Sequence, residues 1–237
     1  MQNWAEDLMW AIAPNSGEAD VFSRIEAAAA VLGFEQCAFG LRVPLPVTNP
    51  KIMMINNYPQ AWQRRYQEAG YVQIDPTVLH GCVSQVPLVW SDRVFSSARE
   101  LWSEAQSAGL RHGWCQSNLD AYGVGSLLTL SRSTEPITVT ELVDKQMKMC
   151  WLASIAHMAL GRLAKPKLYG EPKADLTARE TEVLKWTIDG KTAGDIADIL
   201  SISIDTVNFH VKNATIKMNS PNKATAAVRA LAMGLLA

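Results

Sequence analysis

Three polar residues near the C-terminal end of the chain could read the edges of DNA bases. Asn208, Lys212 and Thr215 fall on one face of a predicted helix. An Asn amide can pair with a base edge, and a Lys ammonium can reach guanine or a phosphate. Four apolar residues recur at helical spacing on the adjoining face: Val207, Val211, Ala214 and Met218. This stripe predicts a helix that packs on a small core and exposes its polar face to a major groove.

Capping residues define the helices around this segment. Two pairs have the spacing of a capping box, Thr177–Glu180 and Thr192–Asp195, so a helix is expected after each threonine. Gly190 is expected to end the first helix, because glycine accepts the left-handed conformation of a C-terminal cap. Ser203 is a suitable N-cap for the third helix. Ser220–Pro221 predicts the start of the last helix, with proline at the first helical position.

Formal charge is divided unevenly along this segment. The carboxylates lie between Asp175 and Asp205, whereas the charged residues after Thr206 are all basic: Lys212, Lys217, Lys223 and Arg229. An acid-free basic segment is suited to a polyanion. A generic helical bundle with a solvated polar face is the alternative, but cap spacing, turn length and charge together favour a helix-turn-helix.

Length and composition limit the number of domains and the possible source of DNA affinity. A chain of 237 residues suits two domains, and 48% hydrophobic residues can supply a sizeable core. The net charge is −1, so any affinity for DNA must come from a local basic patch and from dimerisation, which doubles the contacts.

The sequence carries no sign of a membrane or secretory location. It has no long apolar run, and the acidic start with Glu6 and Asp7 does not resemble a signal peptide. The four cysteines are scattered, without paired metal spacing or a disulfide-dense pattern: Cys37, Cys82, Cys115 and Cys150. Reduced thiols in a cytoplasm, with no metal and no cofactor, are therefore expected.

The first 164 residues mix helical and strand patterns. Helices are expected over 18–33, 60–69 and 140–163, and strands over 37–43, 52–55 and 125–131. Helices that bracket an antiparallel sheet form an α/β/α sandwich, so the fold class is α+β with an all-α four-helix domain at the end. Residues 165–174 are rich in lysine and proline and are predicted to be a linker between domains 1–164 and 175–237.

An aromatic cluster in the first domain could bind a small molecule. Trp62 and Tyr66 are one helical turn apart, so their rings share a face. Tyr58 precedes that helix, and Asp75 and Trp90 follow it. On spacing alone, core packing is the more common explanation of such a pair, and Asp before proline often caps a helix.

The C-terminal segment resembles the LuxR-type helix-turn-helix domain, a four-helix module shared with NarL-type response regulators. The resemblance implies that residues 203–218 form the recognition helix and that the last helix carries a dimer contact. The residues expected to contact DNA are Thr206, Asn208, Lys212, Asn213 and Lys217.

The first domain resembles the autoinducer-binding domain of LuxR-type quorum-sensing receptors, closest to the QscR and RhlR branch. Six residues match its signature in type and order: Trp62, Tyr66, Asp75, Pro76, Trp90 and Gly113. One departure follows Gly113, where residues 114–118 are more polar than an Ile-Pro-like strand.

The resemblance implies an N-acyl-homoserine lactone as ligand. Trp62 is a pure donor and suits the ring carbonyl, whereas ionised Asp75 is a pure acceptor and suits the amide N–H. Hydroxyl groups suit the amide carbonyl, and the candidates are Tyr58, Tyr66, Thr129 and Ser131. Trp90 and Trp102 would wall the lactone ring. The candidates for the acyl slot are Met53, Met54, Leu79, Val83, Leu88, Leu128 and Leu130.

The expected function is that of a quorum-sensing transcription factor and not of an enzyme. Ligand would stabilise the first domain, the protein would form a homodimer, and the dimer would bind two-fold promoter DNA. RNA polymerase is a further expected partner, and a membrane is not.

Three alternatives share part of this pattern. A response regulator would need an acidic phosphoacceptor pocket near its N-terminus, which the sequence lacks. A lactone-processing enzyme would need a nucleophile elbow, but residues 123–126 lack the Gly-x-Ser-x-Gly form, and the histidines lack metal-ligand spacing. An anti-activator that forms mixed dimers or occupies sites shares every motif, so the sequence cannot separate it from an activator.

Overall fold

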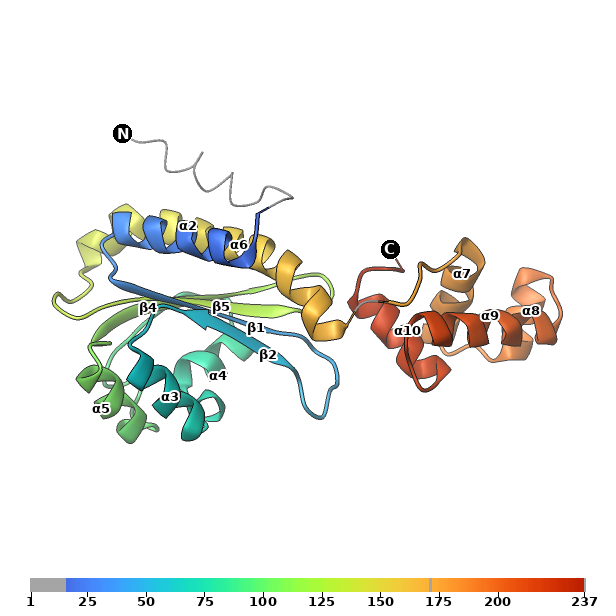
Figure 1. Ribbon diagram of the computed structural model, residues 1–237, viewed down its shortest axis with the longest axis horizontal. Coiled ribbons are helices and arrows are strands. Elements are labelled where there is room, and N and C mark those ends of the chain that lie inside the picture. The colour runs from blue at the N-terminus through green and yellow to red at the C-terminus, as the bar shows by residue number, and fades with distance from the viewer. Residues whose placement is uncertain (1–15, 171, 237) are drawn as a thin grey trace. The chain divides into compact units, whose positions relative to one another are not determined.

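The computed structural model describes residues 16–170 and 172–236 (Figure 1). The chain divides into two compact units, with the main boundary between Ala164 and Lys165. Glu6 and Asp7, on which the expectation about a signal peptide rested, lie outside the described residues. Within those residues, no helix is both long and apolar enough to cross a membrane.

A five-stranded antiparallel sheet forms the middle of the first unit. Its strand order is β2-β1-β5-β4-β3, so β5 and β1 lie inside the sheet and β3 is a short edge. The strands are β1 (Gln36–Arg42), β2 (Ile52–Asn56), β3 (Leu88–Val89), β4 (His112–Leu119) and β5 (Gly125–Arg132). The register pairs Gly113 with Ser131 and Cys115 with Thr129, which places these four residues on one face of the sheet.

Helices cover both faces of this sheet, as the sandwich prediction requires (Figure 1). One face carries α2 (Glu18–Val31) and α6 (Val139–Tyr169). The other carries α3 (Gln60–Glu68), α4 (Pro76–Val83) and α5 (Arg99–Ser107). The α/β/α sandwich is therefore confirmed.

Strand β4 lies inside the sheet, between β5 and β3, although its sequence gives a weak strand signal. Gln116 and Asn118 interrupt its apolar residues, so the alternation expected of a half-buried strand is lost. Both side chains lie on the α6 side, where the Ser154 hydroxyl donates to Asn118 Oδ1 at 3.3 Å. Pairing with β5 along the whole strand compensates for its polar composition.

After Tyr169, the described residues of the second unit form four helices: α7 (Ala178–Ile188), α8 (Ala193–Leu200), α9 (Ile204–Lys217) and α10 (Lys223–Ala232). Both predicted capping boxes are present, and the Ser203 hydroxyl caps α9 by accepting from the Thr206 amide at 3.1 Å. Gly190 follows α7 with a φ of 80°, as its predicted capping role requires.

Two boundaries differ from the prediction. The last helix begins at Lys223 and not near Pro221, because Asn222 is its N-cap and accepts from the Thr225 amide at 2.9 Å. Helix α6 continues to Tyr169 with Pro166 inside it, so residues 165–169 are helical and not broken as their composition suggested. Burial of Ala164 and Tyr169 accounts for this extension, since packing outweighs the cost of one missing backbone hydrogen bond.

Candidate ligand and DNA sites

Three aromatic rings form the centre of the candidate ligand site, on the sheet face that carries α3, α4 and α5. Trp62 is buried on α3, and its ring meets that of Tyr66 edge-on at 5.8 Å between centroids. Tyr71, which the sequence did not single out, lies 6.0 Å from Trp62 and 5.9 Å from Tyr66. The predicted Trp–Tyr pair is thus part of a larger aromatic cluster that fixes α3 against the next turn.

Asp75 brings a carboxylate to the edge of this cluster. Its Oδ1 accepts from the Thr77 amide at 2.8 Å and from the Thr77 hydroxyl at 2.7 Å, so it caps α4. Its Oδ2 accepts from the Tyr66 hydroxyl at 2.9 Å. Burial raises the pKa of Asp75, and these hydrogen bonds offset the rise only in part. No cation pairs with Asp75 among the described residues, so Oδ2 keeps acceptor capacity.

Hydroxyl groups line the neighbouring part of the sheet. Thr129 and Ser131 lie on the same face of β5 and are both buried. Burial raises the pKa of Tyr58, as do nearby Cys37 and Asp75, and a hydrogen bond from Ser131 opposes the rise. All four predicted carbonyl donors therefore lie on one side of the sheet, but Tyr66 already donates to Asp75.

Three predicted acyl-slot residues on the strands face the wrong way. Met53 pairs with Leu41, and Leu41 pairs with Ser126, so Met53 shares the sheet face of Ser126. Leu128 and Leu130 alternate with Thr129 and Ser131, so they point to the opposite face of the sheet. That face belongs to α6, because the same alternation includes Ser126, which is 2.8 Å from His157 Nδ1 on α6. The prediction placed four consecutive residues of β5, 128–131, in one site, although neighbouring side chains of a strand point to opposite faces.

Trp90 is held by the close approach of the backbone at Gly113. A Cβ atom on Gly113 would lie 2.3 Å from the Trp90 ring, so only glycine fits there. The Trp90 ring meets Trp102 edge-on at 6.0 Å, and Trp102 stacks on Phe95 at 4.4 Å. The Trp90 Nε1 atom is buried and has no hydrogen-bond partner in the described part of the chain.

Trp102 can supply only an apolar wall. Its Nε1 donates to Asp92 Oδ1 at 2.7 Å, so this N–H is already occupied. Asp92 gave no signal in the sequence, because an exposed aspartate in a loop is common. In contrast, Trp62 Nε1 donates to none of the described residues, which suits its predicted role as a free donor.

Helix α9 presents the candidate DNA-reading residues in the second unit. Val207, Ala214 and Met218 are fully buried, and Val211 is partly buried against the same core. Asn208 and Lys212 are exposed on the outward face of α9.

The remaining predicted DNA contacts divide into two groups. Thr206 and Asn213 are partly buried, and the Thr206 hydroxyl lies 2.8 Å from that of Ser203. The Lys217 ammonium donates to Glu180 Oε2 at 2.8 Å and to the Asp175 carbonyl at 2.9 Å. Lys217 therefore binds α9 to the start of α7, and we assign it to the fold and no longer to DNA contact.

Comparison with known proteins supports a ligand-binding domain followed by a DNA-binding domain. The autoinducer binding domain model matches residues 17–160, and the model for bacterial regulatory proteins of the luxR family matches residues 174–230. The chain belongs to the LuxR family. Its first unit thus contains an autoinducer-binding domain, and its second is the family's helix-turn-helix domain.

Named relatives of this LuxR-family regulator cover almost its whole length. The transcriptional activator protein AnoR of Acinetobacter nosocomialis is 42% identical over 100% of both chains. The quorum-sensing regulator RhlR of Pseudomonas aeruginosa is 37% identical and covers 98% of this chain and 96% of its own. The crystal structure of Escherichia coli SdiA matches with a TM-score of 0.85 at 37% identity, over 99% of this chain and 98% of that one. These relatives confirm the prediction of a transcriptional regulator and do not favour the alternative of a lactone-processing enzyme.

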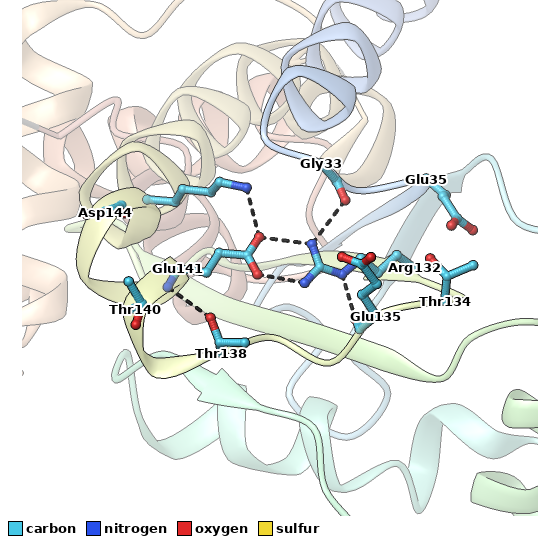
Figure 2. Close-up of a pocket in the computed structure, with 10 residues that line it drawn as sticks. Gly33, Glu35, Arg132, Thr134, Glu135, Thr138, Thr140, Glu141 and Asp144 are labelled. Carbon is cyan, nitrogen blue, oxygen red and sulfur yellow. Dashed lines mark hydrogen bonds and ion pairs between the residues drawn. The ribbon is translucent and has the colours of Figure 1, made fainter.

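A shallow pocket of about 540 Å³ lies elsewhere in the regulator, where β5 leads into α6 (Figure 2). Arg132 fills its floor and pairs with Glu141 through Nη2–Oε2 at 2.6 Å and Nη1–Oε1 at 2.9 Å. The same guanidinium donates to the carbonyls of Gly33, Glu135 and Pro136. With its donors satisfied, Arg132 holds the loop to the end of α2 and offers nothing to a ligand.

Proposed function

We propose that this LuxR-family regulator binds an N-acyl-homoserine lactone between the sheet and helices α3 to α5. The ligand would lie against Trp62, Tyr66, Asp75 and Trp90, with the lactone ring walled by Trp102. The observation that carries the proposal is Asp75, a buried carboxylate that has hydroxyl and amide donors but no cation among the described residues. Its Oδ2 accepts one hydrogen bond, from Tyr66, so it can accept a second from the neutral amide N–H of a ligand.

The other polar groups complement the remaining parts of the ligand. Trp62 Nε1 suits the ring carbonyl, because it is a donor and makes no hydrogen bond to another described residue. Tyr58 suits the amide carbonyl, since Tyr66 is committed to Asp75. The Ser131 hydroxyl donates to Gln36 Oε1 at 3.4 Å, so it would have to turn to donate to the ligand. Thr129 lies beside them on the same strand face and can contribute a further hydroxyl.

We assign the acyl chain to apolar residues on the same side of the sheet. Leu127 belongs here, because its side chain lies 3.1 Å from the position of a Cβ on Gly81 of α4. Met54 shares this face by register, because Met54 pairs with Gly40, and Gly40 pairs with Leu127. Leu79 and Val83 of α4 are both more than half exposed and lie across the helix from Gly81, so they face away from the sheet and we leave them out of the slot. Each methylene buried contributes about 0.8 kcal/mol.

The DNA-binding step follows from the second unit. We infer that a homodimer places two copies of α9 in successive major grooves of two-fold promoter DNA. Thr206, Asn208, Lys212 and Asn213 would make the contacts. We infer a cytoplasmic location and, for activation, contact with RNA polymerase. We assign ligand binding to residues 1–164 and DNA binding to residues 175–237.

A thermal-shift series tests the ligand class. Purified full-length protein would be heated with acyl-homoserine lactones of increasing chain length, with and without a 3-oxo group. A rise in unfolding temperature that depends on chain length is expected, because the ligand binds only the native state. A flat response would reject the lactone.

A second acyl compound provides the matched comparison. SdiA, 36% identical to this chain, has been seen in complex with octanoyl-rac-glycerol. Octanoyl glycerol lacks the amide N–H that we assign to Asp75, so it should stabilise the protein less than the lactone of equal acyl length. Equal stabilisation by both would show that the acyl chain alone is recognised.

A further inference from the structure

The outward face of α9 carries a large apolar side chain in its middle. The exposed residues of this face are Asp205, Asn208, Phe209, Lys212 and Ile216. Phe209 is 60% exposed and follows directly after Asn208, in the N-terminal half of the helix. An aromatic ring of this size therefore lies beside the two polar side chains that we assign to base reading.

Phe209 has no part in holding the domain together. The two apolar clusters of the second unit are built on Val207, Ala214 and their neighbours, and Phe209 belongs to neither. Its ring meets the ring of His210 edge-on, with centroids 5.6 Å apart and planes at 71°. This contact orients the ring without burying it, so its apolar surface is available to a partner.

The chemistry of a major groove limits what Phe209 can recognise. A phenyl ring neither donates nor accepts a conventional hydrogen bond, so it cannot read the polar groups of a base edge. The C5-methyl group of thymine is the apolar feature that the major groove displays. The N-terminal residues of a recognition helix are the ones that approach base edges. Phe209 has this position, whereas Ile216, two turns further on, does not.

We propose that Phe209 is a specificity-determining residue that packs on the C5-methyl group of a thymine in each half-site. This thymine would lie in, or directly beside, the base pair read by Asn208. The proposal rests on the proposed function of α9 as the recognition helix. It adds a methyl contact to the hydrogen bonds and phosphate contacts already assigned.

Replacement of thymine by deoxyuridine tests the contact, because it removes the methyl group and leaves the pairing unchanged. Full-length protein, with a mixture of short-, medium- and long-chain acyl-homoserine lactones, would first select its sites from a randomised duplex library. Each thymine of the selected site would then be replaced in turn by dU. Removal of one methyl group should weaken binding about fourfold per half-site. Replacing both symmetric thymines should weaken it about tenfold to twentyfold.

Three variants identify the side chain responsible. Phe209→Ala should bind the dT and dU duplexes equally well. Ile216→Ala is the matched control, an exposed apolar residue on the same face, and should keep the full dT preference. Lys212→Ala should weaken binding to both duplexes and also keep the preference. A further duplex has a C·G pair where the thymine was. Replacing that cytosine by 5-methylcytosine restores a methyl group at this position and should restore part of the affinity.

The outcomes separate this inference from the proposed function. If no sequence is selected, or if Lys212→Ala has no effect on binding, the assignment of α9 as recognition helix fails. If a site is selected but no thymine methyl matters, the inference about Phe209 fails alone. If replacing dT by dU weakens the binding of Phe209→Ala as much as that of the wild type, the inference about Phe209 also fails.

Discussion

Asp75 and Glu141 are carboxylates in the same unit, and their surroundings shift their pKa values in opposite directions. Glu141 pairs with Arg132 at 2.6 Å and with Lys145 at 2.8 Å, and the hydrogen bonds from Arg132 lower its pKa to about 2. Asp75 receives hydroxyl and amide hydrogen bonds only, and burial raises its pKa. One carboxylate is fully compensated within the fold, and the other is not.

The second unit shows the same contrast between two lysines. Lys217 binds Glu180, a nearly buried carboxylate. Burial alone would raise the pKa of Glu180, but its partners Lys217 and Thr177 lower this pKa overall. Lys212 is exposed and has no ion-pair partner among the described residues. The comparison teaches that charges compensated inside the protein maintain the fold, whereas charges with spare capacity mark where a ligand or DNA can bind.

The largest effect is expected from Glu141→Gln. Removing one partner of a largely buried ion pair should lower the free energy of unfolding by about 3–5 kcal/mol, because Arg132 stays buried without its counter-charge. Urea denaturation followed by tryptophan fluorescence would measure it. Asp144→Asn, an exposed residue near the same pocket, is the control and should change little. Lactone-induced stabilisation should survive in both variants. Its loss in Glu141→Gln alone would contradict the assignment of Glu141 to the fold and not to the ligand site.

The pH dependence of stability sharpens the same point. The folded-state pKa of Glu141 is below its ordinary value of 4.5, so its contribution is complete above pH 4.5 and is lost as the pH falls toward about 2. Asp75 has the opposite sign, since its folded-state pKa is raised and its ionisation costs stability as the pH rises. Glu141→Gln should therefore flatten the acid limb of the stability curve. An unchanged acid limb would contradict the assignment.

Asp75→Asn should have the next largest effect. It should change the response to the ligand more than the stability of the fold. Loss of a hydrogen bond to a charged acceptor should raise the lactone concentration needed for half response about tenfold to a hundredfold. Asn can still cap α4, and the buried charge is gone, so the unliganded variant should be no less stable at neutral pH. A promoter reporter and a thermal scan measure the two effects. A variant that is simply unstable would show Asp75 to be structural.

Gly113→Ala should give a smaller, steric effect. The added Cβ would overlap the Trp90 ring, and overpacking typically costs about 1–3 kcal/mol. Displacement of Trp90 should also weaken lactone binding, which calorimetry would detect. Gly194→Ala in α8 is the control, because the nearest atom to a Cβ there lies at an ordinary 3.7 Å and the residue is in the other unit. Equal behaviour of the two variants would argue against a packed role for Trp90.

The smallest effect is expected from the lysine pair. Lys212→Ala should leave the unfolding temperature unchanged and lower the slope of log affinity against log salt by about one for each phosphate that Lys212 neutralises. Lys217→Ala should instead lower the unfolding temperature of the second unit, because Glu180 loses its cation. Fluorescence anisotropy with promoter DNA and thermal scans would compare the two. Reversed results would move Lys217 back to the DNA contacts.

Local signals predicted most of the fold. The capping boxes of α7 and α8 depend on residues three positions apart, so they could be recognised without tertiary information. The start of α10 could not, because Ser220–Pro221 and Asn222 are competing start signals. The extension of α6 past Ala164 depends on the burial of Tyr169, which composition does not reveal.

The candidate site was predictable by residue type but not by contact. Trp62, Tyr66 and Asp75 fit a signature in order, yet nothing in the sequence showed that Tyr66 donates to Asp75. The orientation of Leu128 and Leu130 depends on strand register, and the pairing of Lys217 depends on a residue 37 positions earlier, Glu180. Long-range contacts of this kind are absent from any local pattern.

Direct measurement of lactone affinity for the wild type, Asp75→Asn and Glu141→Gln tests the central claim most directly. Isothermal titration calorimetry would use the lactone that stabilises the wild type best. We expect Asp75→Asn to bind at least about tenfold more weakly and Glu141→Gln to bind as the wild type does while unfolding more easily. Equal affinity in the wild type and Asp75→Asn, or a loss confined to Glu141→Gln, would contradict the account.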